Sequence, residues 1–139
     1  MRIAVWHNLP SGGGKRALYD HVKGLISRGH TIESWCPPTA DQTFLPMSDL
    51  VIEHIVELVP PWRSRVQQIT DLAVGPTSST SITLARMDEH CRRCAAEIMD
   101  GDFDVVLGGS CWALCVTSLA RYLSLPKVLY LQEDRKSVV

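Results

Sequence analysis

The sequence predicts an α/β domain with a Rossmann-like, doubly wound parallel sheet of about five strands, in the order 3-2-1-4-5. Short apolar runs rich in β-branched residues alternate with segments whose apolar residues recur at helical spacing. This alternation is typical of βαβ units and a parallel sheet. Right-handed crossovers between such strands favour the stated order. The length of 139 residues, with 45% hydrophobic and 21% charged residues, is ordinary for one independently folding domain.

The first strand and the first helix are predicted close to the N-terminus. Residues 3–7 (IAVWH) form a short, mostly apolar run, as expected for a strand buried on both faces. After a turn-rich stretch, apolar side chains follow one helical stripe, and Arg28 with Gly29 would end that helix. The stripe consists of Leu18, Val22, Leu25 and Ile26.

The middle of the chain predicts two further strands and two helices. Residues 31–36 and 51–59 are rich in β-branched and apolar residues, and each run stops at a pair of prolines. A helix is expected over about residues 63–73, before a Gly-Pro break. A longer helical stripe begins at residue 82 and ends at Gly101.

The last two strands are predicted at residues 104–107 and 128–131. Gly-Gly-Ser follows the first of them, and Ser110 has the chemistry of a helix N-cap. The helix that it would open carries Leu114, Leu119, Ala120 and Leu123. We therefore expect one domain over residues 1–133, followed by an irregular tail at residues 134–139.

A ligand is expected where two glycine-rich stretches meet. Open parallel sheets bind ligands beyond the carboxyl ends of their strands, at the point where the strand order reverses, here between the first and fourth strands. Glycines permit close backbone approach, and helix N-termini attract phosphate or carboxylate. Glycines that serve only the turns are the competing interpretation. The candidate binding residues are Gly12, Gly13, Gly14, Lys15 and Arg16, and the cleft edge includes His7, Gly109 and Ser110.

Two nucleotide-binding patterns compete for the first glycine stretch. The run from Gly12 to Ala17 formally fits the G-x-G-x-x-A dinucleotide fingerprint, with Glu33 about twenty residues on as a ribose-binding acid. However, the glycines begin several residues past the strand, and Glu33 lies within the second strand, not at its tip. A P-loop is excluded because Arg16 follows Lys15 where Ser or Thr is required. A stand-alone nucleotide- or dinucleotide-binding domain without catalysis is the alternative function.

The opening of the chain resembles the start of the family 4 retaining glycosyltransferases of the GT-B fold. Those chains begin with a strand, a loop ending in Gly-Gly, and a helix ending in a GL…RGH pattern before the second strand. The later segments DFDVVLGGSCWA and LPKVLYLQE are similar to the fourth and fifth strands of that family. The residues that match its opening pattern are Gly13, Gly14, Gly24, Leu25, Arg28, Gly29 and His30.

The resemblance implies an enzyme that moves a sugar from a nucleotide-diphosphate donor to a glycan, lipid-linked or small-molecule acceptor, with no cofactor and no essential metal. In that family the N-terminal domain mainly binds the acceptor, and the C-terminal domain binds the nucleotide. We therefore expect an incomplete N-terminal domain that is inactive by itself because the donor-binding half is absent. Many members place a His after the fifth strand, where this chain has Gln132 and Glu133 as candidates for the cleft edge. The catalytic residue is thus unassigned.

Metal binding is not predicted. The pairs Cys91–Cys94 and Cys111–Cys115 have spacings near those of a zinc ribbon, but both pairs fall on periodic, apolar helical segments. Five cysteines, an odd number, in a chain with no recognisable export signal also argue against a disulfide framework. We expect reduced, mostly buried thiols that carry no metal.

The charge balance excludes some partners. A net charge of −1 without a basic patch argues against nucleic acid, and no apolar run is long enough to span a bilayer. We therefore expect a cytoplasmic protein. Trp62 beside Arg63 and Arg65 would suit weak, peripheral membrane contact, although a loop with Trp62 folded onto the domain is the competing interpretation.

Overall fold

Five parallel strands form one sheet in the order β3-β2-β1-β4-β5 in the computed structural model, which describes residues 1–59, 79–111 and 117–130. This order confirms the predicted α/β, Rossmann-like fold class. It reverses between β1 and β4, at the centre of the sheet. The strands are β1 (Arg2–Asn8), β2 (Thr31–Cys36), β3 (Ile52–Ile55), β4 (Val105–Cys111) and β5 (Lys127–Leu129).

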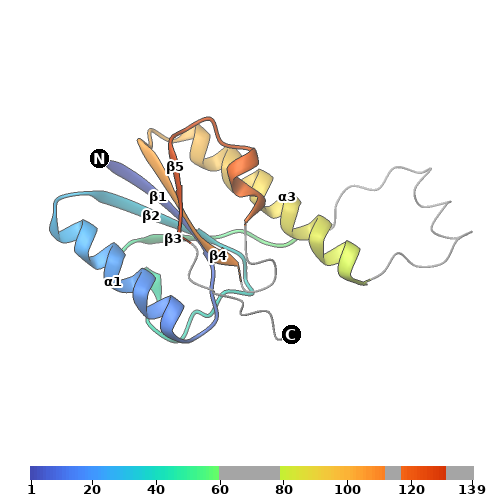
Figure 1. Cartoon of the computed structure of the whole chain (residues 1–139), viewed down its shortest axis with the longest axis horizontal. Coiled ribbons are helices and arrows are strands. Elements are labelled where there is room, and N and C mark those ends of the chain that lie inside the picture. The colour runs from blue at the N-terminus through green and yellow to red at the C-terminus, as the bar shows by residue number, and fades with distance from the viewer. Residues whose placement is uncertain (60–78, 112–116, 131–139) are drawn as a thin grey trace, which may run out of the picture.

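Helices cover the two faces of the sheet. α1 (Gly13–Ser27) lies against one face and α3 (Ser79–Asp100) against the other, so the sheet is sandwiched between them (Figure 1). Two 3-10 helices, η1 (Met47–Asp49) and η2 (Ser118–Arg121), follow β2 and β4 in the chain. The predicted helical stripes before Gly29 and Gly101 thus correspond to α1 and α3.

Each face of the sheet has its own apolar core, because successive side chains of a strand point to opposite faces. On the α1 side, Val5 of β1 packs in one cluster with Leu18 and Val22 of α1. On the α3 side, Trp6 packs in a second cluster with buried residues of α3. Val5 and Trp6 are both fully buried, as expected for a strand covered on both faces.

β3 is shorter than the strand predicted at residues 51–59. Its last paired residue is Ile55, opposite Cys36 at the end of β2, and the last backbone bond runs from the Val56 amide to the Cys36 carbonyl at 3.0 Å. The next residue of β2 would be Pro37, which has no N–H to continue the ladder. β3 therefore ends where its neighbour ends.

β4 is longer than the strand predicted at residues 104–107, since it continues through the Gly-Gly-Ser stretch. Its register with β1 shifts between Trp6 and Asn8, so that Gly109 and Ser110 together lie opposite His7 in a β-bulge. A Cβ atom on Gly109 would lie 3.2 Å from the carbonyl oxygen of Trp6. Gly109 therefore allows β1 and β4 to lie close together, and it does not form a turn after the strand.

The prediction that Ser110 caps a helix is wrong. Ser110 lies within β4, is 1% exposed, and its hydroxyl donates to the carbonyl of Tyr130 at 3.4 Å. Pairing of β4 with both β1 and β5 holds this stretch in the sheet. Among the residues described after β4, the helical segment is η2, and its N-cap is Thr117, whose hydroxyl accepts from the Leu119 amide at 3.1 Å.

Some predictions fall on residues that the structure does not describe. These are the helix over residues 63–73, the membrane-contact segment around Trp62, and the tail at residues 134–139. Of the helices in the described ranges, none combines the length and the apolar content that crossing a bilayer requires.

Candidate functional site

The loop between β1 and α1 begins where the strand order reverses. Residues 9–15 line a hollow of about 230 Å³ at this point. Gly12 has φ 144° and ψ −164°, a conformation that residues with a side chain rarely adopt. This glycine allows the chain to turn from the loop directly into α1.

The start of α1 presents unpaired backbone N–H groups beside this hollow. The first hydrogen bond within the helix runs from the Arg16 amide to the Gly12 carbonyl at 3.1 Å. The amides of Gly13, Gly14 and Lys15 precede it and so have no acceptor inside the helix. A Cβ atom on Gly13 would meet nothing within 4 Å, so the space beside it is open. Such a helix start is suited to binding an anion.

The positively charged ends of Lys15 and Arg16 lie in different places. Lys15 is fully buried, and its Nζ donates to the carbonyl of Asp41 at 3.0 Å. Burial lowers the pKa of Lys15, against the opposing influence of Glu53. Arg16 is exposed, and its guanidinium carbon lies 5.8 Å from the ring centre of Phe44. The charge of Lys15 therefore lies beneath the loop, and that of Arg16 lies at the surface.

The turn after β2 is bonded to the loop after β1. The Asp41 amide donates to the Leu9 carbonyl at 3.0 Å, and the Thr39 hydroxyl donates to Asn8 Oδ1 at 3.0 Å. Together with the bond from Lys15, these contacts tie the two segments at the carboxyl ends of β1 and β2. The hollow is thereby supported by two neighbouring loops.

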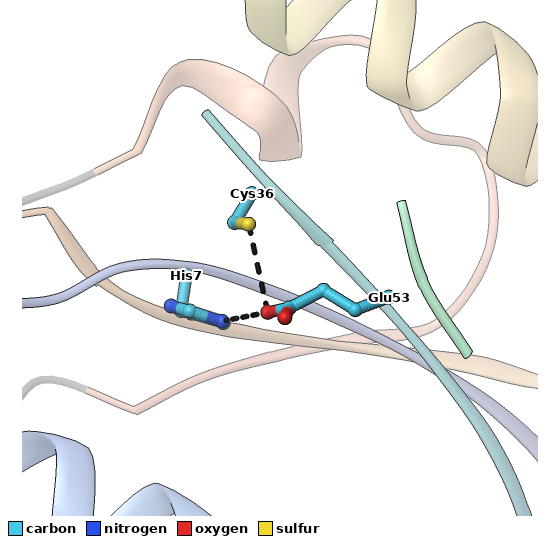
Figure 2. Close-up of side chains that lie close together, drawn as sticks. All are labelled: His7, Cys36 and Glu53. Carbon is cyan, nitrogen blue, oxygen red and sulfur yellow. Dashed lines mark hydrogen bonds and ion pairs between the residues drawn. The ribbon is translucent and has the colours of Figure 1, made fainter. Parts of the chain in front are cut away.

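Three side chains from neighbouring strands converge beneath the loop. His7 of β1, Cys36 of β2 and Glu53 of β3 point toward one another (Figure 2). His7 Nε2 lies 3.2 Å from Glu53 Oε1, and the Cys36 thiol donates to the same oxygen at 3.5 Å. His7 and Cys36 are fully buried, and the Glu53 side chain is 3% exposed. We call these three residues the buried triad.

Burial sets the charge states of the buried triad. Burial lowers the pKa of His7, which the hydrogen bond to Glu53 only partly offsets. Burial and the charge of Glu53 raise the pKa of Cys36 to about 12. Burial alone would raise the pKa of Glu53, but the hydrogen bond from His7 and the charge of Lys15 outweigh it and hold this pKa below its usual value. The triad thus consists of a neutral imidazole, a thiol and a carboxylate.

The predicted cleft-edge residues are only partly described. His7 lies below the glycine loop, and Gly109 with Ser110 forms the bulge opposite it on β4. Gln132 and Glu133 lie outside the described residues. The role of all these residues in binding stays a prediction.

Glu33, the acid of the dinucleotide pattern, already has two side-chain partners. Its carboxylate pairs with the Arg2 guanidinium at 3.1 Å and lies 2.8 Å from His54 Nε2. It also sits in the middle of β2, where it pairs with Ala4 of β1. The acid of a dinucleotide site would have to lie at the strand tip, so this geometry does not favour dinucleotide binding.

The cysteines weighed as zinc ligands share one apolar cluster in the described part of the chain but form no group of three close ligand atoms there. Cys91, Cys94 and Cys111 are buried and free, and Cys115 lies outside the described residues. Among the described residues, the buried triad alone brings three potential ligand atoms within 4.8 Å of one another. Sequence reasoning missed Cys36 and Glu53 because no local motif joins them to His7.

The comparisons with known proteins agree with the fold. No family model and no curated protein matches the chain. Among solved structures, MurG from Acinetobacter baumannii superposes with a TM-score of 0.59 at 15% identity, over 92% of this chain and 34% of the MurG chain. The C-terminal domain of the PF1911 hydrogenase from Pyrococcus furiosus has a TM-score of 0.46 at 14% identity, over 94% and 89% of the two chains, which is too weak to support an inference. The chain is therefore similar in fold to part of MurG, a GT-B glycosyltransferase, and spans about a third of its length.

Proposed function

We propose that this chain is the N-terminal, mainly acceptor-binding part of a glycosyltransferase that moves a sugar from a nucleotide-diphosphate donor to an acceptor. The observation that carries the proposal is the glycine loop of residues 9–15, which borders a hollow at the strand-order reversal of a sheet similar to one in MurG. Ligands of open α/β sheets bind at this position. A second domain would supply the nucleotide-binding half.

In this proposal the backbone of the loop binds the charged part of a ligand. The amides of Gly13 and Gly14, at the positive end of α1, would donate to a diphosphate or to an anionic acceptor. Gly12 would allow the turn that brings them to the hollow, and the exposed Arg16 would add positive charge at its rim. His7 is buried beneath the loop, so its part would be to support the loop rather than to contact the ligand.

Amide NMR of the purified chain tests this proposal. UDP and inorganic diphosphate are titrated separately, and we expect the largest shift changes at residues 12–16 with both. NAD⁺ is the third probe, because a stand-alone dinucleotide-binding domain would bind it more tightly than UDP. A stronger NAD⁺ response at the same amides would favour that alternative.

Two glycine variants on the same helix show whether the loop itself binds. Gly13→Leu fills open space beside the hollow, whereas a Cβ on Gly24 would meet only the tip of the Arg28 side chain, at 3.2 Å. Leu is a good helix former at both positions, so both variants should fold. We expect Gly13→Leu to weaken diphosphate binding at least about tenfold, and Gly24→Leu to bind like the wild type. Equal binding by both variants would remove the glycine loop from the site.

A further inference from the structure

Buried polar atoms without partners gather on the α1 side of the sheet. Within the described part of the chain, His7 Nδ1, Ser34 Oγ and Glu53 Oε2 are buried and have no hydrogen-bond partner. They come from β1, β2 and β3, three adjacent strands. Buried polar groups are almost always satisfied in folded proteins. These atoms border the buried triad, and their second polar atoms, His7 Nε2 and Glu53 Oε1, face each other within it.

Two of the three distances within the buried triad match edges of a tetrahedral coordination sphere, and the third, from His7 Nε2 to Cys36 Sγ, is at most 4.8 Å. Zinc–ligand bonds of 2.0–2.3 Å at tetrahedral angles separate nitrogen from oxygen by about 3.3 Å, and sulfur from oxygen by about 3.5 Å. His7 Nε2 and Glu53 Oε1 are 3.2 Å apart, and Cys36 Sγ and Glu53 Oε1 are 3.5 Å apart. Figure 2 shows the His7 ring nitrogen and the Cys36 sulfur both directed at one carboxylate oxygen of Glu53. An ion would take the place of these two hydrogen bonds, with the three ligand atoms moving apart around it.

The structure assigns to His7, Cys36 and Glu53 a site for a divalent transition metal of the Zn²⁺ type, with one coordination position left for water. Imidazole, thiolate and carboxylate are the three ligand types that Zn²⁺ prefers in proteins. The ligands come from the carboxyl ends or middle of adjacent strands, so the sheet holds them in position. Neither the proposed sugar-transfer role nor the glycine loop is needed for this assignment.

The charges around the triad determine how tightly a cation binds. Metal binding releases the Cys36 thiol proton to solvent and requires the neutral His7 to carry its proton on Nδ1, so that Nε2 is free to bind. The thiolate and the Glu53 carboxylate then together balance the two charges of the ion. Gln42 Nε2 donates to Cys36 Sγ at 3.3 Å, a contact that supports a thiolate from outside the coordination sphere. Among the described residues, Lys15 is a cation close enough to influence His7 and Glu53, and it opposes the metal. Removal of the Lys15 charge should therefore tighten binding.

Cobalt binding to the purified chain tests the site. The protein is first treated with a chelator under reducing conditions, and Co²⁺ is then added while the near-ultraviolet and visible spectra are recorded. We expect one equivalent to bind with a sulfur-to-cobalt charge-transfer band and with the visible bands of tetrahedral Co²⁺. Zn²⁺ should then displace the Co²⁺ and abolish both sets of bands. A chain that shows no charge-transfer band at one equivalent overturns the assignment.

Four variants separate this site from other cysteines and from folding effects. Cys36→Ala should lose the charge-transfer band, whereas Cys91→Ala, which removes a buried thiol on α3, should keep it. Glu53→Gln preserves the shape of the side chain and should bind Co²⁺ at least about tenfold more weakly, with a folded circular dichroism spectrum. Lys15→Met should bind on the order of tenfold more tightly. A band that persists in Cys36→Ala, or unchanged affinity in Glu53→Gln, contradicts the assignment.

Discussion

Trp6 Nε1 donates a buried hydrogen bond of 3.2 Å to His90 Nε2, while the other ring nitrogen of His90 donates to the carbonyl of Val56 at 2.9 Å. One ring nitrogen therefore accepts and the other donates, which defines His90 as a neutral imidazole protonated on Nδ1. The two bonds join β1, α3 and the segment after β3 within the α3-side core. Burial lowers the pKa of His90 to about 4.

This depressed pKa predicts a loss of stability in acid. Between pH 6.5 and about 4 the unfolded chain takes up a proton at His90 that the folded chain does not, so the free energy of unfolding falls as the pH falls. The contribution of His90 is up to about 3 kcal/mol. Urea denaturation at pH 7 and pH 4.5 measures it, with His90→Gln as the comparison. If wild type and variant lose equal stability between these two pH values, His90 is not the group responsible.

The bulge glycine of β4 is predicted to be needed for packing. A Cβ at Gly109 would lie 3.2 Å from the Trp6 carbonyl and 3.4 Å from His7 Cβ, and backbone atoms of two paired strands cannot easily move apart. Gly109→Ala should therefore destabilise the fold by about 1–3 kcal/mol. Gly13→Ala adds a methyl group to open space and should change stability by less than about 0.5 kcal/mol. Thermal melts of both variants check this, and equal melting temperatures would contradict it.

The glycines at the two ends of α1 should have equal effects on stability but different effects on binding. Gly12 and Gly29 have φ values of 144° and 84°, and a Cβ at either position would meet nothing within 4 Å. Alanine at either site should therefore cost about 1–3 kcal/mol through backbone strain alone. In the diphosphate titration, we expect only Gly12→Ala to weaken binding. Weakening by Gly29→Ala to the same extent would mean that the loss reflects general destabilisation.

The 139-residue chain by itself should not transfer sugar at a measurable rate. Catalysis of group transfer depends on holding donor and acceptor in one geometry, and the proposed function assigns the donor to a second domain. Incubation with nucleotide-sugar donors and detection of released nucleoside diphosphate tests this. Robust turnover by the purified chain would contradict the proposal that a second domain binds the donor.

Local patterns in the sequence were sufficient for α1, α3 and the strand order. The stripe of Leu18 and Val22 and the stop at Gly29 predicted α1, because helix periodicity and a positive-φ stop depend only on neighbouring residues. The order 3-2-1-4-5 followed from the alternation of elements and the handedness of crossovers. Strand ends were predicted less well. Ser110 was predicted as a helix N-cap but lies in β4, because pairing with β1 continues through it.

By itself, the sequence determined the fold class, the helices α1 and α3, and the placement of a glycine loop at the reversal of strand order, because these depend on short-range periodicity and backbone chirality. Only the tertiary structure decided where side chains meet. His7 and Glu53 are 46 positions apart, and Cys36 lies 17 positions before Glu53, so no local pattern joins them. Lys15, predicted as a ligand-binding residue of the loop, is buried near them. Parallel pairing of β1, β2 and β3 creates this cluster, and pairing depends on the whole sheet rather than on any one segment.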